Sequence, residues 1–98
     1  MKYEDYPIHY PQMFQQALVG AHNLEFSTKA KAVAFRTELY RYRYTVRAGL
    51  TPGDRGLKEF YDDLMKITLP IKFTQSLNTW TLTLSKKKLQ FVEKLNER

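Results

Sequence analysis

The sequence lacks cysteine altogether and contains few residues that interrupt secondary structure. No cysteine occurs among the 98 residues, and glycine and proline occur four times each. The absence of cysteine excludes disulfides, thiolate zinc sites, iron–sulfur clusters and cysteine nucleophiles. The sequence has no run of about 18 apolar residues that could cross a membrane. The N-terminal stretch has no basic start followed by an apolar core, so we expect no signal peptide and a cytoplasmic location.

The residues that are present suit one small folded domain. The sequence is 43% hydrophobic and 14% aromatic. A chain of this length buries enough surface for one core, so we expect a single domain over residues 1–98. The aromatic content and the moderate charge exclude disorder for most of the chain. Residues 1–10 are expected to form an irregular aromatic arm, which either packs over the domain or docks onto another copy or a partner.

Acidic residues are scarce in the middle of the chain. The net charge is +6, and the segments 1–28, 29–58 and 59–98 carry net charges of −2, +6 and +2. A localised basic patch raises the local concentration of polyanions and speeds their capture. Nucleic acid is the commonest such partner, and an anionic membrane or an acidic protein face would meet the same requirement.

The hydrophobic spacing predicts an α+β domain with a small three-stranded sheet, packed by one long basic amphipathic helix and two to three shorter helices. Proline at position 11 is expected to open the first helix, because its missing N–H costs nothing there. Pro70 is expected to place its strand at an edge or to bulge it, because proline cannot donate a ladder hydrogen bond. The predicted elements are a helix over 11–20, a strand over 23–27, helices over 29–48 and 57–65, strands over 67–73 and 79–85 that form a hairpin, and a last helix after Ser85.

The helix over residues 29–48 is the strongest element, because it contains no glycine or proline and Gly49 suits its C-terminal cap. Its apolar residues recur on one face and predict a contact with the core. A second line of residues, about 100° around the helix, is basic. That stripe consists of Lys29, Arg36, Tyr40, Arg43 and Arg47, with Arg41 and Tyr44 further around the exposed side.

Two interpretations of the basic stripe stay open. It is either an ordinary solvated helix face or a surface that binds a polyanion. Three features favour the polyanion. Only Glu38 offsets the cations between residues 29 and 50, whereas a merely soluble helix mixes the two signs. Arginine, which dominates from residue 36 onward, suits phosphate bidentately and stacks on bases. Exposed tyrosine beside arginine can stack on the bases of a single strand, and Tyr40 is the better candidate because Tyr42 lies on the apolar face.

A second cationic cluster, Lys86–Lys87–Lys88, is expected where the last strand enters the last helix. Cations in a first helical turn oppose the helix dipole, so this placement suggests a phosphate near the helix start. The alternative is a solubilising cluster that protects a strand edge. The sequence leaves open whether this cluster joins the arginine stripe on one surface.

We expect no catalytic site, no metal and no cofactor. His9 and His22 have no ligand spacing around them. The adjacent Asp62 and Asp63 diverge by about 100° on a helix, so they suit a solvated face better than a shared cation. Trp80 lies on the apolar face of its strand and is expected to pack in the core.

Three stretches carry a resemblance to known proteins. Leu24-Glu-Phe-Ser, the run from Ala34 to Arg43, and Thr81-Leu-Thr-Leu resemble small uncharacterised proteins of bacteriophages, and the resemblance covers about half of the chain. The resemblance implies a viral setting, with the host cytoplasm as the location, and no catalysis. It is consistent with DNA binding, and favours DNA over RNA, because compact phage genomes encode many DNA-binding proteins.

These observations lead to the hypothesis of a non-enzymatic nucleic-acid-binding protein with little sequence specificity and no membrane partner. The alternative is a small phage-type interaction module or inhibitor that binds an acidic protein surface, and a third interpretation is an assembly factor that self-associates through its aromatic arm. Asparagine and glutamine are absent from the long helix, so it lacks the side chains that usually recognise adenine. The residues expected to contact nucleic acid are Lys29, Arg36, Tyr40, Arg41, Arg43, Tyr44, Arg47, Lys86, Lys87 and Lys88.

Overall fold

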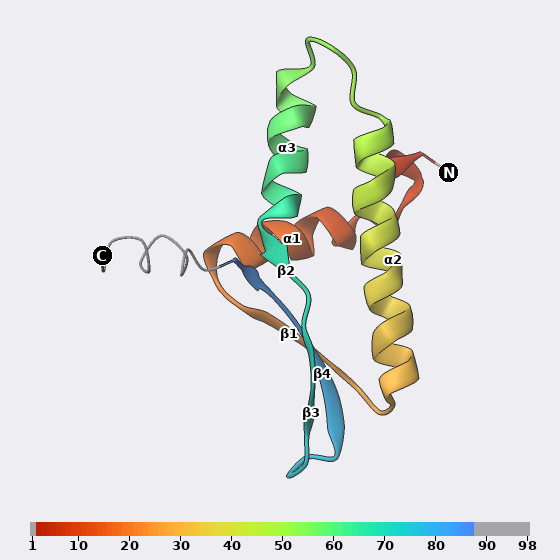
Figure 1. Cartoon of the computed structure of the whole chain (residues 1–98), viewed down its shortest axis with the longest axis vertical. Helices are drawn as coiled ribbons and strands as arrows, with labels where there is room; N and C mark the ends of the chain where they lie inside the picture. The colour runs from red at the N-terminus through yellow and green to blue at the C-terminus, as the bar shows by residue number, and fades with distance from the viewer. Residues whose placement is uncertain (1, 88–98) are drawn as a thin grey trace, which may run out of the picture.

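The computed structural model describes residues 2–87 as three α-helices and an antiparallel sheet (Figure 1). Each element follows from local signals in the sequence, and the order along the chain is the one predicted. The elements are η1 (Tyr3–Asp5), α1 (His9–Val19), β1 (His22–Phe26), α2 (Lys29–Ala48), α3 (Arg55–Met65), β2 (Ile67–Thr68), β3 (Ile71–Thr74) and β4 (Thr79–Lys86). The α+β class is confirmed, and the predicted last helix lies outside the described residues.

Helix α2 begins and ends at the predicted residues. The hydroxyl of Thr28 accepts a hydrogen bond from the backbone N–H of Lys31 at 3.2 Å, which satisfies one of the free donors of the first turn. At the other end, the N–H of Gly49 donates to carbonyls of the last turn. Helix α3 starts in the same way, because the carboxylate of Asp54 accepts from the N–H of Leu57 at 3.0 Å.

Strand β4 is the centre of the sheet. It pairs with β1 on one side, while β2 and β3 follow one another along its other side. The single strand predicted over 67–73 is thus two strands, so the sheet has four strands instead of three. The reason is Pro70, which has no N–H and separates β2 from β3. Its carbonyl still accepts from the N–H of Thr83 at 3.0 Å, which holds the edge in place.

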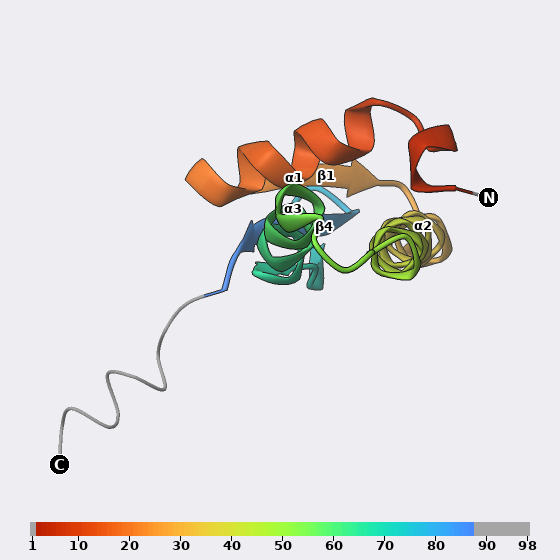
Figure 2. The ribbon, with the colours of Figure 1, turned by 90° about the horizontal axis from the view of Figure 1, so that it is seen from above.

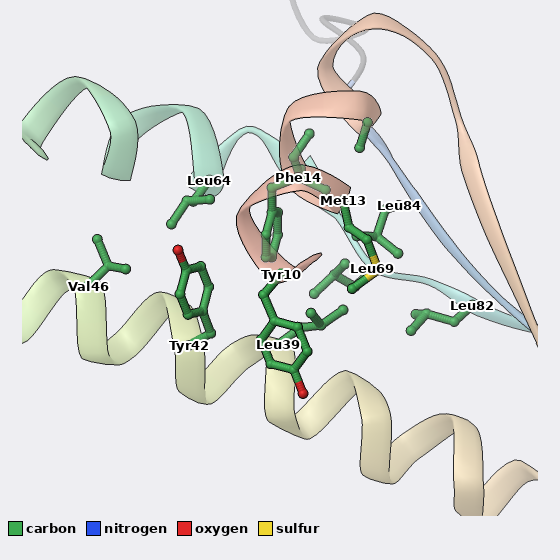
Figure 3. Close-up of a cluster of buried hydrophobic side chains, with 12 residues drawn as sticks. Tyr10, Met13, Phe14, Leu39, Tyr42, Val46, Leu64, Leu69, Leu82 and Leu84 are labelled. Carbon is green, nitrogen blue, oxygen red and sulfur yellow. The ribbon is translucent and has the colours of Figure 1, made fainter. Parts of the chain in front are cut away.

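Helices cover the face of the sheet that carries Leu82 and Leu84. Both α1 and α2 pack on β4, and Figure 1 shows α1 lying across the direction of the strands, while Figure 2 shows α2 end-on. Helix α3 lies antiparallel to α2 (Figure 1) and closes the upper end of the core. The core side chains, most of them drawn in Figure 3, are Tyr10, Met13, Phe14, Ala17, Leu39, Tyr42, Val46, Leu64, Ile67, Leu69, Leu82 and Leu84.

Helix α1 starts two residues earlier than predicted, so Pro11 is its third residue and not its first. The physical reason for the proline remains the same, because the N–H groups of the whole first turn lack an intrahelical acceptor. The arm before α1 packs against the domain. The Tyr6 ring lies edge-on to Tyr42 with centroids 5.4 Å apart, and its hydroxyl is 3.3 Å from that of Thr45.

Candidate nucleic-acid interface

The basic stripe of α2 faces α3 and β2 along most of its length. The apolar residues Ala32, Leu39, Tyr42 and Val46 are buried, as the periodicity predicts. The stripe lies beside them, so its side chains emerge where α2 meets the α3–β2 junction. Within the stripe, the structure separates two kinds of cation. Some are held by the fold, and others stand free on the surface.

Arg36 and Arg43 belong to the first kind. The Nη1 of Arg43 donates to the carbonyls of Leu64 at 3.2 Å and Ile67 at 3.0 Å. The Nη1 of Arg36 donates to the carbonyl of Leu69 at 3.4 Å. The Leu64 carbonyl lies in the last turn of α3, where carbonyls have no intrahelical donor. These half-buried arginines therefore tie α2 to α3 and to the edge strand, a role that the sequence analysis did not identify.

The surroundings of Arg43 shift its pKa and fix the position of its guanidinium. Burial lowers the pKa of Arg43, and the neighbouring hydroxyls of Tyr40 and Tyr61 oppose that shift. The guanidinium also lies over the Tyr40 ring, 4.9 Å from its centroid. A cation over an aromatic face is attracted by the ring quadrupole, so this contact holds Tyr40 in place while leaving it 45% exposed.

Tyr44 and Arg47 are the free pair near the C-terminal end of α2. Tyr44 is 71% exposed and Arg47 is exposed. A hollow of about 180 Å³ runs between α2 and α3 beside them. We call its lining the Tyr44 surface, and its residues are Tyr40, Arg43, Tyr44, Arg47, Tyr61 and Met65. Another hollow, of about 360 Å³, lies on the far side of Tyr44 and is lined by Tyr6, Thr37, Tyr40, Arg41, Tyr44 and Thr45.

These two hollows make Tyr44 a projecting ring with concave surface on either side. Among residues 2–87, none of the side chains that line either hollow is acidic. The arrangement can hold a flat ring against Tyr44 and an anion against Arg47.

The α3 part of the Tyr44 surface was not found from the sequence. Tyr61 and Met65 belong to the apolar residues whose helical spacing predicts this helix, and that spacing alone indicates no surface role for them. In the structure Met65 is 49% exposed and lies across the hollow from α2. The signal that could have found it is its position as the last residue before the α3–β2 junction, where a helix leaves the core.

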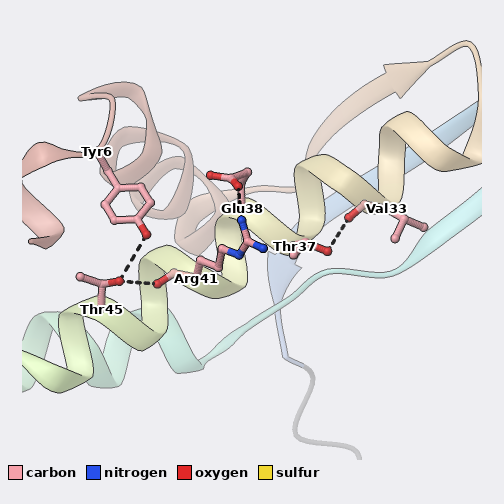
Figure 4. A network of polar contacts seen from close by, with 6 residues as sticks. All are labelled: Tyr6, Val33, Thr37, Glu38, Arg41 and Thr45. Carbon is pink, nitrogen blue, oxygen red and sulfur yellow. Dashed lines mark hydrogen bonds and ion pairs between the residues drawn. The ribbon is translucent and has the colours of Figure 1, made fainter. Parts of the chain in front are cut away.

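Arg41 lies apart from the stripe, on the side of α2 that faces the N-terminal arm. It forms an ion pair of 3.0 Å with Glu38, one turn earlier (Figure 4). The side chain of Arg41 is largely exposed and that of Glu38 is half-exposed. Figure 4 also shows Thr45 on this side, bonded to the Arg41 carbonyl and to Tyr6. The neighbouring carboxylate offsets the charge of Arg41, so this side chain would attract an anion less than an unpaired arginine would.

Lys29 occupies the opposite end of the stripe. Its ammonium lies 5.5 Å from the centre of the Trp80 ring. Trp80 is half-buried, and it packs on Phe73 with centroids 4.9 Å apart. The expectation of a core tryptophan is therefore only partly met, because the ring lies at the margin of the core, at the far end of the sheet.

The two described lysines of the cluster, Lys86 and Lys87, lie near the α3–β2 junction. Lys86 is the last residue of β4 and pairs with Ile67, so it does not begin a helix as expected. The N–H of Lys87 donates to the Lys66 carbonyl at 2.7 Å. Both lysines are exposed, and Lys88 lies outside the described residues. Because Arg43 binds the carbonyls of Leu64 and Ile67, which flank Lys66, the arginine stripe approaches the same junction as Lys86 and Lys87.

The two aspartates of α3 pair with lysines of their own helix and its cap. Asp62 accepts from Lys58 at 2.6 Å, and Asp63 accepts from Lys66 at 3.2 Å. Within the described part of the chain, no three side chains of the metal-binding types come together. Over the same residues, no helix is both long enough and apolar enough to cross a membrane.

Comparison of the chain with protein-family models, with curated proteins and with solved structures gives no match. The inference of function therefore depends on the residues of this chain alone.

Proposed function

We propose that the protein is a non-enzymatic nucleic-acid-binding domain that uses the Tyr44 surface with little sequence specificity. The observation that carries the proposal is the exposed pair of Tyr44 and Arg47 beside a hollow. Among residues 2–87, no carboxylate lines this hollow. A tyrosine ring can stack on any base, since every base has a π-face. A guanidinium beside it can bind the adjoining phosphate with two parallel hydrogen bonds.

The charge distribution supports the same proposal. The middle segment carries a net charge of +6, equal to that of the whole chain. Arg36 and Arg43 add two guanidinium groups to the same stripe, and the main chain engages one terminal nitrogen of each. A guanidinium has five N–H donors, so further contacts remain to be made. Lys86 and Lys87 extend the positive surface beyond the junction.

The proposal implies a partner without a fixed sequence, and DNA is preferred to RNA. Sequence readout needs side chains that match base edges, and α2 carries no asparagine or glutamine for adenine. Contacts to base faces and phosphates, which the Tyr44 surface would make, position a strand without reading its sequence.

An acidic protein surface is the second candidate. Tyrosine, arginine and methionine are enriched at protein interfaces, and Met65 is exposed among the residues of the Tyr44 surface. Such a partner would exploit the same side chains, so the two candidates are separated by binding measurements and not by geometry.

Fluorescence anisotropy with labelled DNA tests the proposal. We expect micromolar binding that weakens log-linearly with salt, as about three phosphate contacts require. Arg47→Glu should weaken it at least tenfold. Arg55→Glu is the matched control, because it makes the same charge change at an exposed position at the start of α3, outside the Tyr44 surface.

Two results would overturn the proposal. Absence of DNA binding at low salt would leave the acidic protein surface as the better account. An equal loss in Arg47→Glu and Arg55→Glu would show that net charge alone attracts DNA and that the Tyr44 surface is not the site.

A further inference from the structure

A second aromatic surface lies at the other end of the α2 stripe. Phe73 is 45% exposed although it belongs to the apolar side of the sheet. It pairs across the hairpin with Trp80, and the two rings are in contact. In Figure 1 the β3–β4 hairpin reaches past the first turn of α2, so this end of the sheet extends beyond the helical layer. We call Phe73 and Trp80 the hairpin aromatic pair.

The hairpin aromatic pair and the Tyr44 surface lie at opposite ends of one helix flank. Lys29 stands over Trp80, and Arg47 stands beside Tyr44. Lys29 and Arg47 are 18 positions apart in one helix, which at 1.5 Å per residue places them about 27 Å apart along its axis. Between them the flank carries Arg36, Tyr40 and Arg43, which all lie on the side of α2 that faces the α3–β2 edge.

The carboxylates nearest to this flank point elsewhere or are paired. Glu38 is on the opposite side of α2 and bonds to Arg41. Glu25 pairs in register with Thr81, so it lies on the sheet face opposite to Trp80. Asp63 bonds to Lys66 at the junction. The flank therefore offers an aromatic surface at each end and positive charge between them.

We propose that a single-stranded nucleic acid lies along this flank, with one base on the hairpin aromatic pair, another at Tyr44, and its phosphates along the cations between them. This inference assumes the proposed function and adds to it the strandedness and the length of the ligand. A duplex is excluded from this mode, because stacking on side chains needs bases whose faces are free. At the 3.4 Å spacing of stacked nucleotides, about eight span the 27 Å flank, and a more extended strand needs fewer.

Trp80 provides a direct readout, because it is the only tryptophan of the sequence. A base that stacks beside it changes its fluorescence, whereas a strand confined to the Tyr44 surface leaves it unchanged. The experiment titrates the full chain with oligothymidines of about three and about ten nucleotides, following the anisotropy of a label and the emission of Trp80 together. We expect the longer strand to bind more tightly and to quench Trp80 at saturation.

Variants at the hairpin end test the same contact. Phe73→Ala should weaken binding of the longer strand about fivefold or more, as loss of a stacking partner does. Lys29→Ala should weaken it by a smaller factor. The controls are Leu77→Ala, which removes another exposed apolar side chain of the hairpin, and Lys31→Ala, which removes another exposed cation of the first turn of α2. Circular dichroism verifies that each variant is folded.

The outcomes separate this inference from the function on which it depends. Two results would contradict the path along α2 without contradicting binding at the Tyr44 surface. One is binding by anisotropy while Trp80 emission stays constant, and the other is equal affinity of Phe73→Ala and Leu77→Ala for the longer strand. Duplex DNA that binds as tightly as the single strand would do the same. Absence of any binding would overturn both.

Discussion

Arg43 and Arg47 lie one turn apart on the same flank of α2, yet they meet different surroundings. The guanidinium of Arg43 donates to two main-chain carbonyls of the α3–β2 junction, whereas Arg47 is exposed at the Tyr44 surface. Tyr42 and Tyr44 differ in the same way, with exposed fractions of 3% and 71%. Periodicity alone gives the two arginines one role. Their neighbours in space give them different roles: Arg43 supports the fold, and Arg47 is exposed.

The largest expected contrast is in stability between the two arginines. Arg43→Ala leaves the Ile67 carbonyl without the guanidinium donor and removes a donor from the Leu64 carbonyl, and an unsatisfied half-buried group costs about 1–3 kcal/mol. Arg47→Ala removes an exposed side chain, so its cost should stay within about 0.5 kcal/mol. Urea denaturation of both variants measures the difference. Equal free energies of unfolding would mean that the Arg43 contacts contribute nothing to the fold.

The pH dependence of the free energy of unfolding gives a second way to compare Tyr42 with Tyr44. Burial raises the pKa of Tyr42 to about 12. Between about pH 10 and 12 the unfolded chain therefore loses the phenol proton before the folded chain does, and the free energy of unfolding falls as pH rises, by roughly 1.4 kcal/mol per pH unit at most.

Urea denaturation at pH 8 and pH 11 checks this dependence. Tyr42→Phe should reduce the loss of stability between the two values, because it removes the group that titrates. Tyr44→Phe, which changes an exposed ring, should leave the loss as in the parent chain. The same pH dependence in all three proteins would contradict a role for Tyr42.

Removal of the Tyr44 ring should separate binding from folding. Tyr44→Ala is expected to weaken DNA binding about fivefold or more, because the base loses its stacking surface. Its free energy of unfolding should change little, since the ring is largely exposed. Anisotropy and urea denaturation of the same sample measure both quantities. If Tyr44→Ala lowered the free energy of unfolding but left DNA affinity unchanged, the Tyr44 ring would serve the fold and not DNA binding.

The smallest effect is expected at the ion pair of Arg41 and Glu38. The side chain of Arg41 is largely exposed and that of Glu38 is half-exposed, and a pair of this kind contributes about 0.5 kcal/mol or less. Arg41→Ala should therefore change stability by no more than that, and it should weaken DNA binding less than Arg47→Ala does. A loss of affinity equal to that of Arg47→Ala would move the site to the other side of α2.

Local signals were sufficient for much of the fold. The bounds of α2 follow from Thr28 and Gly49, and the break in the edge strand follows from Pro70, because capping and proline chemistry act within a few residues. The β3–β4 hairpin also agrees with the prediction. The start of α1 was misplaced, because proline is acceptable anywhere in a first turn and so does not mark a single residue.

The candidate site was only partly predictable. The stripe of α2 could be identified from spacing, since helical periodicity places Arg43 and Arg47 on one flank. That Arg43 would be engaged depends on where the carbonyls of Leu64 and Ile67 lie, and those are set by the packing of α3 and β2 on the core. The same holds for Met65 and Trp80. Their apolar character predicts burial, but each lies where the covering layer ends.

The salt dependence of DNA binding tests the central claim most directly. The equilibrium constant for a labelled single strand is measured at several salt concentrations for the parent chain and for Arg47→Ala and Arg55→Ala. If Arg47 binds a phosphate, its removal should lower the slope of log affinity against log salt by about one, and Arg55→Ala should leave the slope unchanged. Equal slopes in all three proteins would contradict a phosphate contact at the Tyr44 surface.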